Sequence, residues 1–164
     1  MPMIILKTHV TAPQELVFNL ARSIDLHMLS LSHTNERAIG GRISGLVDTD
    51  DTVTWRARHF GITQELTSHI IEMQPHDFFA DVQVRGAFKS FKHEHHFKTL
   101  QNGDTLMEDV FCYISPLGLL GKIADVLFLK KYMTRLLEQR NAALKTTAES
   151  GSWATLPGMS DAAL

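Results

Sequence analysis

Hydrophobic and polar residues alternate along several segments of the chain, a pattern typical of half-buried β-strands. The clearest alternation is "TVTWRARHF" (52–60), which puts Trp55 and His59 on one face and Arg56 and Arg58 on the other. Four further strands are expected at 3–10, 62–73, 78–85 and 88–100, and a fifth is expected to end before Ser115. The Gly-rich segment "ERAIGGRISGLV" predicts one more strand, which is bent. The pattern therefore predicts an antiparallel sheet of about six to seven strands.

The hairpin that follows "FKSFKHEHHFKTL" (88–100) has a predictable register. "QNG" (101–103) fits a three-residue loop with Gly103 in the left-handed conformation, and this loop pairs Leu100 with Asp104. The opposite face of the hairpin is rich in charge, as expected for the solvent side. The predicted inward residues are Phe91, His93, His95, Phe97, Met107, Asp109, Phe111 and Tyr113.

Two short helices are predicted after the first strand, and a long helix after Ser115-Pro116. An apolar stripe at helical spacing predicts the face of the long helix that packs on the sheet. The stripe includes Ile123, Val126, Leu129 and Met133. We expect one domain over residues 1–147, followed by a flexible C-terminal tail over 148–164 with small, polar residues.

Composition narrows the class of protein. The 164 residues are 44% hydrophobic and carry a formal net charge of -2, which favours a globular domain and disfavours a nucleic-acid partner. No apolar stretch reaches the roughly 20 residues of a membrane span, so stable membrane insertion is not expected. The single cysteine, Cys112, suits a reducing compartment, and we expect a cytoplasmic protein.

Three strings carry a family resemblance: "VTWRARHFG" (53–61), "FFADVQVRGAFKSFKHEHHF" (78–97) and "MEDVFCYISPLGLLG" (107–121). With the order of the predicted elements, they resemble the START-like (SRPBCC) superfamily. Within it they resemble bacterial ligand-binding, polyketide cyclase-like and cell-division-inhibitor-like proteins. The resemblance implies the helix-grip fold, an α+β fold in which a curved antiparallel sheet wraps a long C-terminal helix. It also implies a cavity between sheet and helix that binds apolar small molecules.

The predicted cavity residues allow three hypotheses. The first is a binder or carrier of a small, largely apolar molecule, in which Trp55, His59, and Asp81 or Gln83 join the inward hairpin residues and the apolar stripe. The second is an acid–base enzyme of the cyclase or dehydratase type that uses His95 and Asp109, with His93 or His59 assisting. The third is a module that binds a protein partner, and a homodimer is left open.

The histidine pair raises the question of a metal. His93 and His95 with a carboxylate have the chemistry of a zinc or iron site, but the third donor has to come from another strand. Buried imidazoles and carboxylates are more often members of hydrogen-bonded networks. From the sequence we therefore expect no metal and no cofactor, and a polar site in an apolar cavity.

Overall fold

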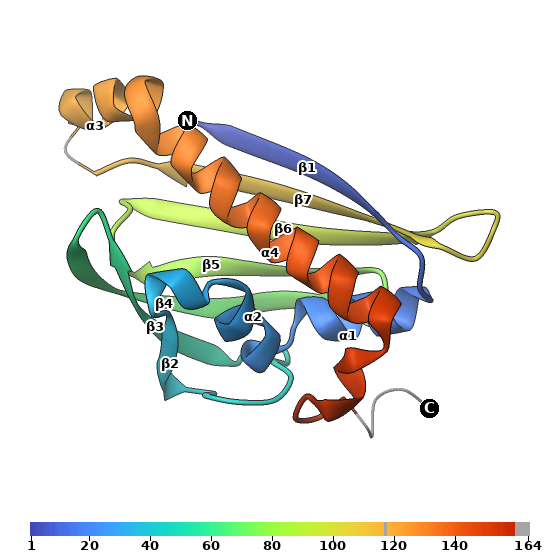
Figure 1. The fold of residues 1–164 in the computed structure, drawn as a ribbon. Helices are drawn as coiled ribbons and strands as arrows, with labels where there is room; N and C mark the ends of the chain where they lie inside the picture. The colour runs from blue at the N-terminus through green and yellow to red at the C-terminus, as the bar shows by residue number, and fades with distance from the viewer. Residues whose placement is uncertain (117, 160–164) are drawn as a thin grey trace.

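Seven antiparallel strands form one curved sheet in the order β1-β7-β6-β5-β4-β3-β2 (Figure 1). The computed structural model describes residues 1–116 and 118–159. The strands are β1 (Met3–Val10), β2 (Arg37–Gly41), β3 (Thr52–His59), β4 (Ile62–Gln74), β5 (Phe78–Arg85), β6 (Ser90–Thr99) and β7 (Thr105–Ile114). This sheet, with a long C-terminal helix lying diagonally across one face, confirms the predicted helix-grip α+β fold.

Helices connect and cover this sheet. Ser23 caps the second helix, where its Oγ accepts a hydrogen bond from the main-chain N–H of Leu26 at 3.2 Å. The helical elements are α1 (Gln14–Ala21), α2 (Ile24–Ser30), η1 (Ser32–Thr34), α3 (Gly118–Ala124), η2 (Asp125–Leu129), α4 (Lys130–Ser150) and η3 (Ser152–Thr155). None of the helices in the described ranges is long and apolar enough to cross a membrane.

The β6–β7 hairpin has the predicted register. Gly103 has a φ of +85°, and the main-chain N–H of Leu100 donates to the oxygen of Asp104 at 2.8 Å. His95 lies opposite Asp109 across the two strands. The eight predicted inward residues are all buried, whereas His96 and Lys98 on the other face are exposed. Because side chains alternate with period two, this single register decides which histidines face inward.

The long helix departs from the predicted stripe. Ile123 and Val126 are 49% and 87% exposed, so the expectation that they pack on the sheet is wrong. The cause is η2, a π-helical turn, which inserts a wider turn and shifts the phase of the side chains around the axis. The buried face of α4 consists of Leu136, Leu137, Asn141, Leu144 and Ala148.

The C-terminal segment differs from the expected flexible tail in the part that is described. Helix α4 continues past residue 147 to Ser150, and η3 follows it. Trp153 packs against the hydrophobic core, and Met159 is fully buried in it. Residues 160–164 lie outside the described residues. The apolar side chains of this segment thus cover a part of the core near α1 and α2.

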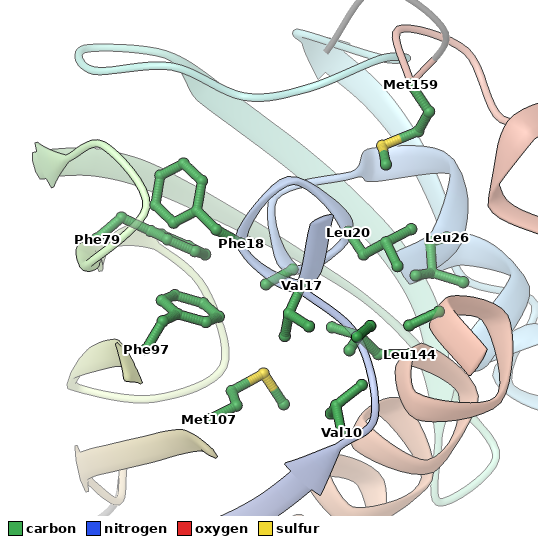
Figure 2. Close-up of a cluster of buried hydrophobic side chains, with 13 residues drawn as sticks. Val10, Val17, Phe18, Leu20, Leu26, Phe79, Phe97, Met107, Leu144 and Met159 are labelled. Carbon is green, nitrogen blue, oxygen red and sulfur yellow. The ribbon is translucent and has the colours of Figure 1, made fainter. Parts of the chain in front are cut away.

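A solid hydrophobic core fills one end of the space between helices and sheet (Figure 2). Phe18 from α1 makes edge-to-face ring contacts with Phe79 and Phe97, with centroids 5.8 and 5.4 Å apart. Met107 and Leu144 complete the same cluster. Because α1 fills this end, open space is left at the other end, under α2 and the first half of α4.

Candidate functional site

A pocket of about 410 Å³ lies between the inner face of the sheet, α2 and the first half of α4. Its walls are mostly apolar and aromatic, as is typical of sites for small molecules. The apolar walls include Ile24, Val53, Trp55, Ile70, Phe88, Phe91, Phe111, Leu129, Met133, Leu136 and Leu137. Polar side chains gather in two separate clusters on these walls.

The first cluster lies on three adjacent strands of the sheet. Asp81 on β5 pairs with His93 on β6, and His95, two residues further along β6, pairs with Asp109 on β7. These positions share the inner face because each pair is directly opposite and the two histidines are one strand period apart. Asp81, His93 and His95 line the pocket, and Asp109 lies behind them, 1% exposed.

Close contacts connect these four side chains. Asp109 Oδ1 lies 2.7 Å from Nδ1 of His95 and 3.2 Å from Nε2 of His93. His95 Nε2 lies 3.7 Å from Asp81 Oδ1. The two contacts with Asp109 are at ion-pair distance, but their geometry is not that of aligned hydrogen bonds. His95 is also held by Phe79, whose ring stacks on it with centroids 4.2 Å apart.

The pKa values of the cluster follow from burial and from these contacts. Burial lowers the pKa of His93 to about 4, with a further lowering by His95, so this imidazole is neutral at pH 7. Burial alone would raise the pKa of Asp109, but contacts with His93 and His95 outweigh it and hold the pKa well below the usual range. Burial likewise opposes the ionisation of Asp81, yet His95 and His93 lower its pKa. The site therefore presents two carboxylates and at least one neutral imidazole.

Asn141 connects the long helix to this cluster. Its Nδ2 donates to Asp109 Oδ2 at 2.6 Å and lies 3.2 Å from Thr8 Oγ1 on β1. Asn141 is 5% exposed, so the amide and the carboxylate share a dry environment in which a hydrogen bond to a charge is strong. Helix α4 thereby fixes one oxygen of Asp109 and leaves the other facing the histidines.

The second cluster lies at the wall formed by α2, β3 and α4. Glu36 Oε1 is 3.1 Å from His27 Nε2, and the His27 ring stacks on Trp55 with centroids 4.3 Å apart. His59 Nδ1 and the hydroxyl of Tyr132 share a hydrogen bond of 2.8 Å. All five side chains line the pocket.

The same two effects shift the pKa values in this second cluster. Burial would raise the pKa of Glu36, but His27 and, more weakly, His59 and Arg140 lower it below its usual value. Burial lowers the pKa of His59, although Glu36 acts in the opposite direction. Burial also raises the pKa of the Tyr132 hydroxyl. Glu36 is therefore a carboxylate at neutral pH on this wall of the pocket.

The structure brings together most of the predicted cavity residues. Those that line the pocket are Trp55, His59, Asp81, Phe91, His93, His95, Phe111, Leu129 and Met133. Phe97, Met107 and Tyr113 face inward but belong to solid core clusters, because α1 and neighbouring aromatic rings fill the space above them. These three are therefore not pocket walls.

Other predicted positions are used differently. Gln83 shares the face of Asp81, but its amide bonds to the main chain of Phe88 in the β5–β6 connection, at 2.7 Å to the oxygen. Asp109 contacts the histidines from behind rather than lining the pocket. Ile123 and Val126 lie on the exposed side of the helix, before the π-turn ends.

Sequence reasoning missed Glu36, His27 and Tyr132 as pocket residues, and gave Arg140 no role there. His27 comes from the short helix α2 and Glu36 from the residue before the bent edge strand β2, and no periodicity indicates the buried side at either place. Tyr132 was not on the predicted inward face of the long helix, because the π-turn shifts the phase of the side chains around the axis. Arg140 follows the apolar stripe at helical spacing, and a cation within an apolar stripe is a signal of a polar pocket wall.

Comparisons with solved structures agree on the architecture. The protein TTHA0849 from Thermus thermophilus superimposes with a TM-score of 0.75 over 92% of this chain and 99% of its own, at 16% identity. A START superfamily protein from Mycobacterium smegmatis gives a TM-score of 0.68 at 13% identity, covering 90% of this chain and 97% of its own. The chain has the START-like fold.

The START-like fold extends to plant proteins among these neighbours. The ginseng major latex-like protein 151 from Panax ginseng matches with a TM-score of 0.65 and 16% identity, over 90% of this chain and 97% of its own. No family model matches the sequence, and no curated protein matches it. Identities this low establish the fold and leave the function to be argued from the site.

Proposed function

We propose that the protein binds a small, largely apolar molecule in the pocket between the sheet and α4. The observation that carries the proposal is a cavity of about 410 Å³ with mostly apolar walls and two polar clusters. Apolar walls supply binding free energy through buried area, and a few convergent polar groups orient the ligand. A solid core would have no reason to keep carboxylates and histidines on its wall, since such groups are costly to bury.

The ligand is expected to carry a polar group that meets the first cluster. Asp109 faces Nδ1 of His95 at 2.7 Å, which favours the tautomer with the proton on Nδ1. Nε2 of His95 is then an acceptor directed toward Asp81 and the pocket. A hydroxyl group is the simplest partner, because it can donate to an imidazole nitrogen or a carboxylate oxygen and can also accept from other donors.

A second candidate is acid–base catalysis of a cyclisation or dehydration. The favouring observation is the Asp109–His95 pair, in which a buried carboxylate orients an imidazole whose other nitrogen faces the pocket. This arrangement is that of a positioned general base. Chemical change in a bound compound distinguishes this candidate from simple binding.

Native mass spectrometry of the protein purified from its own cells tests the proposal. We expect a retained compound, and we expect the neutral apolar dye Nile red to compete with it. The variant His95→Phe should weaken binding of the compound by about 1–3 kcal/mol, the scale of one buried hydrogen bond, while His96→Phe on the outer face serves as control. Absence of both a retained compound and Nile red binding would contradict the proposal. A product that forms only with His95 present would establish the catalytic candidate.

A further inference from the structure

We propose that Asp81, His93 and His95 bind one divalent first-row transition-metal ion at the inner face of the sheet, with Asp109 as the residue that positions His95. The inference concerns the same pocket as the proposed function. It rests on the proposed function in one respect only, which is that the open side of the ion would face a bound molecule. The sequence left the third donor undecided between Asp81 and Gln83. The structure places Asp81 directly opposite His93, whereas the side-chain amide of Gln83 on β5 bonds to the main chain of Phe88.

The donor atoms are already gathered. One ligand atom from each of Asp81, His93 and His95 lies within 4.8 Å of the others. Ligands at roughly 2.0–2.2 Å from a tetrahedral zinc ion are about 3.4 Å from one another. The required contraction is small, and the Asp81 side chain, 15% exposed, is less tightly enclosed than the two histidines. The two histidines are fixed on one strand, with ring centroids 3.9 Å apart.

Asp109 gives His95 the orientation of a metal ligand. In protein metal sites, a ligating histidine commonly donates its second N–H to a carboxylate, which fixes the tautomer and leaves the other nitrogen to bind the ion. Here Asp109 Oδ1 faces Nδ1 of His95, and Nε2 faces Asp81 at 3.7 Å. Asn141 holds the second oxygen of Asp109 at 2.6 Å, so the supporting carboxylate is itself held in place.

The cluster is incompletely satisfied by protein groups alone. Among the described residues, Nε2 of His93, Nδ1 of His95 and Oδ1 of Asp109 are buried without an aligned hydrogen-bond partner. The guanidinium of Arg140, a cation on the pocket wall, donates to the main-chain oxygen of Ala21 at 2.8 Å. A metal ion bound to the three donors would draw the rings into one fixed geometry and balance the charges of Asp81 and Asp109.

The donor set indicates the class of ion. Two imidazoles and one carboxylate suit Zn²⁺ or Fe²⁺ and are poor ligands for Ca²⁺ or Mg²⁺, which prefer oxygen. Three protein donors leave coordination positions open on the side of the cavity. An oxygen of a molecule held by the apolar walls would meet the ion there.

Tag-free protein treated with EDTA and then titrated with Zn²⁺, and separately with Co²⁺ as a visible spectroscopic probe, tests the inference. We expect one ion per chain and a Co²⁺ absorption band typical of nitrogen and oxygen ligands. Asp81→Asn, nearly isosteric and therefore expected to fold, should weaken binding at least tenfold. Asp109→Asn should weaken it by about tenfold to a hundredfold, as changes behind metal ligands do. His96→Phe is the matched control on the outer face of the same strand, and should bind as the wild type does.

Each remaining result overturns the inference. Binding that is equal in wild type and Asp81→Asn would assign the ion to exposed histidines elsewhere on the surface. If circular dichroism shows that the wild-type protein is folded and it still does not bind one metal ion per chain, the role of the cluster would be that of a hydrogen-bonded network. Nile red binding measured on the same metal-free sample separates this failure from failure of the proposed function, because the dye needs only the apolar cavity.

Discussion

Asn141 offers the sharpest test of how the long helix supports the site. Replacing it by alanine removes the donor that lies 2.6 Å from Asp109 Oδ2 and the contact with Thr8 Oγ1 at 3.2 Å. A hydrogen bond to a buried charge contributes about 1.5–3 kcal/mol and a neutral one about 1, so Asn141→Ala should lower the free energy of unfolding by about 2–4 kcal/mol. Urea unfolding followed by circular dichroism measures this difference.

A double-mutant cycle identifies the partner. Asp109→Asn keeps the shape of the side chain and removes the charge, so the loss caused by Asn141→Ala should be smaller in that background by about 1–2 kcal/mol. Gln139→Ala, an exposed polar change on the same helix, should alter stability by less than about 0.5 kcal/mol. A cycle without coupling, or a loss for Asn141→Ala no larger than that for Gln139→Ala, would refute the proposed connection between α4 and the carboxylate.

Three further predictions concern other parts of the molecule. Contact with His27 lowers the pKa of Glu36, so the carboxylate of Glu36 stabilises the fold at neutral pH. This contribution is lost as the pH falls below about 4.3, the usual pKa of glutamate, and then through the lower pKa that Glu36 has in the folded protein. The difference in unfolding free energy between wild type and Glu36→Gln should therefore be larger at pH 7 than at pH 3, and an unchanged difference would contradict this. Gly121→Ala should destabilise the protein by about 1–3 kcal/mol in thermal or urea unfolding, because the added Cβ would overlap the main-chain oxygen of Pro116. Val126→Asp should leave unfolding and Nile red binding unchanged at an 87% exposed position, whereas Leu136→Asp on the pocket wall should abolish binding or unfold the chain.

The sequence by itself determined the strands and the register of the last hairpin. Alternation is a local property, and a three-residue loop ending in Gly103 leaves one pairing that puts Phe91, Phe97, Phe111 and Tyr113 together on the buried side. From this alone His93, His95 and Asp109 could be placed on one inner face. The order of these elements, together with the three strings that resemble START-like proteins, implied the helix-grip fold.

Tertiary structure decided which inward residues meet open space. Phe97 and Met107 have the same alternation as His95, but α1 covers them and turns their surroundings into solid core. The third member of the polar cluster depended on how β5 pairs with β6, which put Asp81 beside the histidines. No local pattern contains that pairing.

The long helix shows the same division most clearly. Its existence followed from helical spacing, but the π-turn at Asp125–Leu129 changed which side of it faces the sheet. Val126 thereby became exposed and Tyr132 joined the pocket wall, while Met133 and Arg140 stayed on the predicted side. The sequence determines which residues alternate, repeat and turn, because those properties depend on near neighbours. The shape of the pocket depends on packing between distant segments, and only the folded chain contains that information.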